Sequence, residues 1–202
     1  MIDLLLSFPY APAVVGRTAI AAGAAGLAAL IFGLLSAAFG HPFGRLYASF
    51  VCLAAVLTAG IAMLIFPQHW AADEQLAQVA FALALVGAFL AALGAVAAFT
   101  SAVSWFLAQL YVASGFALIG LWLLIVTISA AAALSLPHRV VSMGWFAGAV
   151  MILGLAAVPG ILMRTEDERS ASWFIRYIGR SGNLGWLLLF PLWCVWLGIS
   201  KF

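Results

Sequence analysis

The sequence predicts an all-α, polytopic integral membrane protein: a single domain in which six transmembrane helices form a bundle, with a short interfacial amphipathic helix. Two observations support this fold class. Hydrophobic residues make up 67% of the 202 residues, whereas charged residues make up only 7%. Between Glu74 and Arg139 the chain has no Asp, Glu, Lys or Arg. A water-soluble domain needs charge on its outer face, whereas a bilayer core disfavours each charge by roughly a few kcal/mol.

The uncharged runs are long enough for six spans, because a helix needs about 20 apolar residues to cross roughly 30 Å of hydrocarbon. Pro67 is expected to end the second span, and Pro191 to kink the sixth. The fourth span exceeds what a bilayer needs, so we expect it to tilt or to project. The expected spans cover about 18–38, 46–66, 76–99, 105–134, 142–163 and 184–200.

One charged stretch of some length, residues 164–182, predicts a helix lying in the membrane surface. Thr165 and Glu168 have the spacing of a capping box, in which the first residue caps a helix and the fourth reaches back to it. The following apolar side chains share one helical face and basic ones cluster beside it: Trp173, Phe174, Tyr177 and Ile178, with Arg169, Arg176 and Arg180. We expect an interfacial helix over about 166–179. The same pattern also suits a helix packed on other protein at the membrane edge.

Basic residues at the helix ends give an expectation for orientation and location. One side of the expected bundle carries Arg17, Arg139 and Lys201, and the other Arg45, Arg164, Arg169, Arg176 and Arg180. The positive-inside rule therefore favours, five to three, an orientation with both termini outside. We expect the N-terminal segment, residues 1–16, to lie at the interface. Short loops and richness in Ala, Gly and Leu suit a multi-pass protein of a bacterial inner membrane.

Small residues recur every three or four positions in three of the expected spans. Because lipid is as apolar as leucine, helices in a membrane associate through close packing at such small residues. The stripes include Gly26, Gly33, Gly87, Gly94, Gly144 and Gly148. We expect these faces to contact other helices of this chain, with a partner chain as the alternative.

Motifs that carry chemistry are absent from the sequence. It contains no H-E-x-x-H, Cys-x-x-Cys, P-loop or Gly-x-Ser-x-Gly pattern. None of the expected spans carries an ionisable residue away from its ends, which disfavours coupled ion transport. The net charge of +2, without a basic run, gives no reason to expect nucleic acid as a partner.

Two sets of polar and aromatic residues are candidates for binding sites. His69 and Asp73 are four residues apart, and His138 is expected on the same side of the membrane, so these three form a candidate metal site. A polar residue and three tryptophans within the spans form a candidate site for a ligand or pigment: Gln109, Trp122, Trp193 and Trp196. Simple helix packing is the competing interpretation of the second set.

These observations lead to three functional hypotheses. The first is a non-catalytic accessory or scaffolding subunit that packs against protein partners in a larger membrane complex. The second is a binding or transport module for a hydrophobic small molecule or lipid. The third is a membrane enzyme acting through His69, Asp73 and His138. The sequence indicates no particular cofactor.

Overall fold

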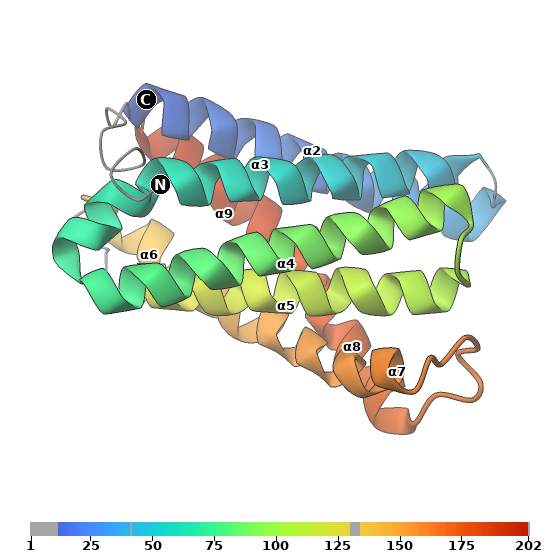
Figure 1. Ribbon diagram of the computed structural model, residues 1–202. Helices are drawn as coiled ribbons and strands as arrows, with labels where there is room; N and C mark the ends of the chain where they lie inside the picture. Colours follow the sequence, from blue (N-terminus) through green and yellow to red (C-terminus); the bar gives the residue numbers. More distant parts are fainter. Residues whose placement is uncertain (1–11, 41, 130–133, 202) are drawn as a thin grey trace.

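The computed structural model describes residues 12–40, 42–129 and 134–201, and helices dominate this part of the chain (Figure 1). In order, the elements are α2 (Pro12–Phe39), α3 (Phe43–Ala72), α4 (Glu74–Thr100), α5 (Trp105–Ser129), α6 (His138–Ile152), η1 (Leu153–Ala157), α7 (Val158–Leu162), α8 (Trp173–Leu184), η2 (Gly185–Leu189) and α9 (Phe190–Lys201). Most of the N-terminal segment expected at the interface, residues 1–11, lies outside the described residues.

The elements combine into six apolar helices that are long enough to span a membrane. Two of these six are composite, because α6, η1 and α7 run on as one helix, as do α8, η2 and α9. Successive helices run in alternating directions and pack side by side from α2 to α6, and α9 closes the bundle against α2 (Figure 1). The prediction of an all-helical bundle with six long apolar helices is therefore confirmed, and this composition suggests a membrane location.

Helix α5 lies at the centre of the bundle. It packs against α4 and α6, and also against α8 and η1. Its exposed large apolar side chains are Trp105 and Ile128, which lie at its two ends. Polar side chains on α5 are therefore held inside the protein, where their hydrogen-bonding partners matter most.

Small side chains face inward and large apolar ones face outward, which is clearest in α4. Every buried residue of this helix is an alanine or a glycine: Ala77, Ala80, Ala84, Gly87, Ala88, Ala91, Gly94 and Ala95. Its outer face carries exposed Leu76, Val79, Val86, Phe89, Leu93, Val96 and Phe99. A helix that is buried through small residues lets its neighbours approach closely, as helices in membranes do.

All six glycines of the predicted packing stripes lie at contacts between helices of this chain. A Cβ on Gly87 would stand 2.6 Å from the Gly115 carbonyl oxygen, and one on Gly94 would stand 2.7 Å from the Ala108 oxygen, so α4 and α5 touch through their backbones. The remaining four lie against Pro191 (Gly26), Tyr47 (Gly33), Trp193 and Thr127 (Gly144), and Gly120 and Leu124 (Gly148).

Two expected helix ends, the start of the first span and the end of the second, are wrong. Helix α2 begins at Pro12, six residues before Thr18, since proline suits the first turn, where its missing N–H has no partner to lose. Helix α3 continues through Pro67 to Ala72. The rings of Phe66, Trp70 and Phe81 pack together around this point, with centroids 5.4 and 4.6 Å from Phe66, and neighbouring helices make such an interior proline tolerable.

The boundary between the fourth and fifth spans also differs from the prediction. Helix α5 ends at Ser129, residues 130–133 are outside the described part, and Leu134 lies in a turn. The fifth span begins at His138 instead of residue 142. Pro137 precedes it, and its carbonyl oxygen accepts hydrogen bonds from the Val140 and Val141 amides at 2.9 and 3.1 Å. Residues 138–141, which lie outside the expected spans, therefore form the start of the fifth helix.

The interfacial helix expected at residues 166–179 does not form as a separate element. Thr165 lies outside any helix, and Asp167 instead organises a turn by accepting hydrogen bonds from the Arg169 amide and the Ser170 hydroxyl at 3.0 and 2.7 Å. The helix begins at Trp173 after Ser172, and it continues without a break into the sixth span. The amphipathic segment is thus the first part of the long sixth helix.

The sixth span changes its winding where a kink was expected. Residues Gly185–Leu189 form a π-helical turn immediately before Pro191. A proline has no backbone N–H to donate within a helix, and its ring crowds the preceding turn, so a wider turn before it relieves that conflict. Pro191 fits against α2, where a Cβ on Gly26 would come within 2.5 Å of its Cγ.

Candidate functional site: a polar cleft between α5 and α8

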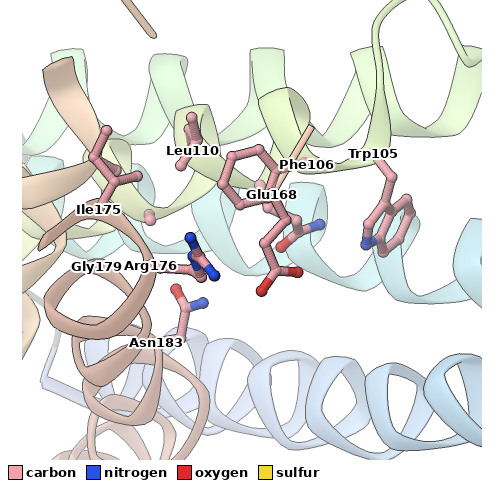
Figure 2. A pocket seen from close by; sticks show the side chains of 11 residues that line it. Trp105, Phe106, Leu110, Glu168, Ile175, Arg176, Gly179 and Asn183 are labelled. Carbon is pink, nitrogen blue, oxygen red and sulfur yellow. The ribbon is translucent and has the colours of Figure 1, made fainter. Parts of the chain in front are cut away.

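Two adjoining cavities open near the end of the bundle that carries the loop between α7 and α8. The first has a volume of about 170 Å³ and lies between α5, α8 and that loop. Figure 2 shows Arg176 and Asn183 of α8 together with Glu168 of the loop, near Phe106 and Trp105 of α5. The complete lining is Trp105, Phe106, Gln109, Leu110, Ala113, Ala157, Glu168, Ile175, Arg176, Gly179 and Asn183.

The second cavity, of about 270 Å³, lies on the side of the cleft that faces α2. It is lined by Leu30, Gly33, Leu34, Tyr47, Trp105, Gln109, Asn183 and Leu187. Trp105, Gln109 and Asn183 line both cavities, so these side chains form a shared wall. We call the two cavities together the cleft, and we name its parts the loop arm and the α2 arm.

The shared wall contains a hydrogen bond that fixes the orientation of the Gln109 side chain. The Tyr47 hydroxyl of α3 donates to Gln109 Oε1 at 2.7 Å. Gln109 Nε2 is buried and has no hydrogen-bond partner among the described residues. An amide nitrogen is a donor only, and a buried donor without an acceptor costs roughly 1–3 kcal/mol. Gln109 therefore lines the cleft and carries a buried N–H group that lacks an acceptor.

A second donor comes from Arg176. Its terminal nitrogen donates to the Ala171 carbonyl oxygen at 3.0 Å, which ties the guanidinium to the loop. The Nε atom is buried and has no partner among the described residues. The carboxylate of Glu168 lines the same arm and keeps the arm from being purely basic. Two residues with buried, unsatisfied N–H donors thus line a cleft that also carries a carboxylate.

Asn183 is oriented from α8. Its Oδ1 atom accepts a hydrogen bond from Trp186 Nε1 at 3.0 Å, and the Trp186 ring stacks on Phe116 at 4.5 Å and 6°. Trp186 is itself buried, so the aromatic core holds Asn183 in position. The cleft is therefore polar at its shared wall and is supported by rigid side chains from three helices.

This arrangement suits binding through hydrogen-bond acceptors. A carboxylate, phosphate or carbonyl group can accept the hydrogen bonds that Gln109 Nε2 and Arg176 Nε can donate. Arginine is well suited to binding carboxylate and phosphate. Small-molecule sites in proteins are mostly apolar cavities with a few fixed polar groups, which describes this cleft.

The structure separates Gln109 from the tryptophans proposed to share its site. Trp122 and Trp193 are buried and meet edge to face at 6.3 Å, and Trp193 Nε1 donates to the Val140 carbonyl oxygen at 3.0 Å. The cavity beside Trp193 has a volume of about 10 Å³, which is no larger than a water molecule needs. Trp196 is 44% exposed on the outside of the bundle. Of this set, Gln109 alone lines the cleft.

Two of the three proposed metal ligands have other hydrogen-bond partners. His69 is buried and its Nε2 lies 2.8 Å from Ser129 Oγ. Asp73 caps α4, since its Oδ1 accepts a hydrogen bond from the Leu76 amide at 3.0 Å. His138 is exposed in the first turn of α6. Within the described part of the chain, no group of three or more His, Cys, Asp or Glu side chains is placed to hold a metal ion.

Replacing Asp73 separates a capping role from a role that needs its charge. Asp73→Ala removes the acceptor for Leu76 and is expected to lower the free energy of unfolding by about 1 kcal/mol. Asp73→Asn keeps an acceptor oxygen and should stay close to wild type. Denaturant titration of the purified protein in mild detergent, followed by circular dichroism, measures both. An Asn variant as unstable as the Ala variant would contradict the capping role and would favour a role that needs the charge of Asp73.

Sequence reasoning missed Tyr47, Arg176, Asn183 and Glu168 as cleft residues. Arg176 was assigned to the basic side of a surface helix, and nothing in a linear pattern pairs Tyr47 with a glutamine in another span. Comparison of the chain with protein-family models, with curated proteins and with solved structures finds no match. The geometry of the cleft therefore carries the functional argument.

Proposed function

We propose that this chain is a multi-pass membrane protein that binds a small amphipathic molecule, whose head group enters the cleft. The observation that carries the proposal is a pair of buried, unsatisfied donors, Gln109 Nε2 and Arg176 Nε, on two residues that line one cavity. A buried donor stays unsatisfied at a cost, so a molecule that supplies acceptors there gains more than it would at an exposed site. The head group is one rich in hydrogen-bond acceptors.

Insertion in a membrane is supported by the distribution of side-chain size. Large apolar side chains cover the outer surface of the long helices, and alanine and glycine fill the contacts between α4 and its neighbours. In water, so large an exposed apolar surface favours association, whereas in lipid it is the expected exterior. We propose the location that the sequence suggests, a bacterial inner membrane.

The accessory-subunit hypothesis has one specific observation in its favour. A wide apolar groove of about 440 Å³ lies between α3 and α4, lined by Ala48, Ser49, Cys52, Leu53, Val56, Ala95, Val96 and Phe99. Its small residues would let a helix of a partner subunit approach closely. Blue-native separation after mild extraction would show defined partner chains above the 21.2 kDa mass of this chain if that hypothesis holds.

Binding in the cleft is tested by native mass spectrometry of the protein purified in mild detergent. We expect wild type to retain one discrete small molecule. Gln109→Glu should lose it, because glutamate still accepts from Tyr47 but replaces the donor with an acceptor. Arg176→Leu should reduce occupancy about tenfold or more, as expected for a lost charge-assisted hydrogen bond.

Two matched controls address nonspecific effects. Gln75→Glu makes the same exchange at an exposed site on α4, and Arg169→Leu removes an exposed charge from the loop beside the cleft. Both should retain the molecule at the wild-type level. A wild-type protein that carries only detergent, or a Gln109→Glu variant that keeps the molecule, would overturn the proposal.

A further inference from the structure

We infer that the bound molecule is a single-chain amphiphile, such as a long-chain carboxylate, whose apolar chain lies in the α2 arm between α2 and η2. This inference rests on the proposed function and specifies how the molecule enters and leaves. The head group would lie against the shared wall, and the apolar chain would extend along the outer surface of the bundle. The molecule then reaches the site sideways from the lipid instead of from water.

The two arms of the cleft adjoin each other at the shared wall. Gln109, whose free donor lies in the shared wall, lines both cavities, as do Trp105 and Asn183. An acceptor group bound to Gln109 Nε2 therefore has two directions in which the rest of its molecule can extend. The loop arm leads toward Arg176 and Glu168, and the α2 arm leads toward α2.

The two arms differ in the chemistry of their lining. Beyond the shared wall, the α2 arm is bounded by Leu30, Leu34 and Leu187, with Gly33 between the first two. The loop arm is bounded by Arg176 and Glu168 as well as by apolar side chains. A molecule with a polar end and an apolar end matches both linings only when its chain lies in the α2 arm. A wholly polar solute would leave the leucines without an apolar partner.

The α2 arm reaches the outer surface of α2. Gly33 lets this helix approach the Tyr47 ring closely, because a Cβ there would lie 3.1 Å from the ring, tighter than an ordinary contact. Leu34, one residue further on, is 64% exposed and lies at the outer edge. The arm is therefore open toward the surroundings of the bundle, where lipid chains would lie in a membrane.

The test uses palmitate carrying a mid-chain diazirine, added to the full chain in lipid nanodiscs. After illumination, mass spectrometry of the digested protein locates the crosslinked residues. We expect crosslinks to concentrate on Leu30, Leu34 and Leu187 and to be displaced by unlabelled palmitate. Crosslinks spread evenly over outward residues such as Val86 and Phe89 of α4, without displacement, would overturn the inference.

Two matched variants narrow the test to the arm itself. Leu34→Trp adds bulk at the edge of the arm, whereas Ile31→Trp adds the same bulk at an exposed position of α2 that does not line it. We expect the first to lower the crosslink yield at least fivefold and the second to leave it unchanged. Equal yields from both variants would also overturn the inference.

The outcomes separate this inference from the proposed function. If Gln109→Glu releases the molecule retained by wild type but palmitate crosslinks are spread evenly, the cleft binds a head group and the chain path is wrong. If Gln109→Glu keeps that molecule and palmitate still crosslinks to Leu30 or Leu187, the arm binds chains and the proposed role of the donors fails.

Discussion

Gly115→Ala is expected to lower the free energy of unfolding by about 3 kcal/mol, at the upper end of the usual cost of overpacking. The added Cβ would meet the Ala91 backbone nitrogen of α4 and would stand 2.5 Å from the Gly87 carbonyl oxygen. Neither is the end of a flexible side chain, so α4 and α5 would have to separate. Because α5 is the central helix, that movement disturbs its other contacts as well.

The measurement is a denaturant titration in mild detergent, followed by circular dichroism. Gly60→Ala is the matched control, since its nearest neighbour would be Thr18 Cγ2 at 3.7 Å, an ordinary contact distance. Alanine favours helix over glycine by up to about 1 kcal/mol, so this control should be as stable as wild type or more stable. Equal destabilisation by the two substitutions would show that the bundle does not depend on backbone contact between α4 and α5.

The long apolar helices could be predicted because their causes are local. An uncharged run of sufficient length indicates a span, and small residues at three- and four-residue spacing indicate a contact face. Gly87 and Gly94 illustrate this, since both lie where α4 meets α5. The sequence does not show which helix they meet, because that depends on the order in which the helices close the bundle.

Helix ends were harder to predict because tertiary contacts override local preferences. Pro67 would stop an isolated helix, but α3 continues past it to Ala72, and the neighbouring Phe66 packs on Phe81 of α4. Thr165 and Glu168 have the spacing of a cap, yet Asp167 draws the nearby backbone into a turn. In both places the sequence pattern is present, but the helix end follows other hydrogen bonds or contacts.

The candidate site was predictable only in part for a related reason. Gln109 stood out as a polar residue in an apolar span, and the structure places it in the cleft. Its partners come from α3 and α8, at positions that no short-range pattern connects. Trp122 and Trp193 also stood out, but a buried aromatic pair and an aromatic ligand wall look the same in a sequence.

Trp193→Ala distinguishes these two roles and is expected to cost about 3–5 kcal/mol of unfolding free energy. The ring is buried against Phe190 at 5.8 Å and Trp122 at 6.3 Å, and its Nε1 donates to the Val140 oxygen. In a bundle surrounded by detergent or lipid, the loss comes mainly from missing contact atoms and from the hydrogen bond. Trp193→Phe keeps a ring and should lose about 1 kcal/mol, chiefly for the hydrogen bond.

Trp196→Ala supplies the control for this substitution, because Trp196 lies one turn further along α9 and is 44% exposed. Its removal leaves no enclosed cavity and should change stability by less than about 0.5 kcal/mol. Denaturant titration and native mass spectrometry on the same samples compare stability with occupancy of the cleft. A Trp193→Ala protein as stable as wild type that has lost a bound molecule would contradict a packing role. That result would make the buried tryptophans part of a ligand site, as the sequence allowed.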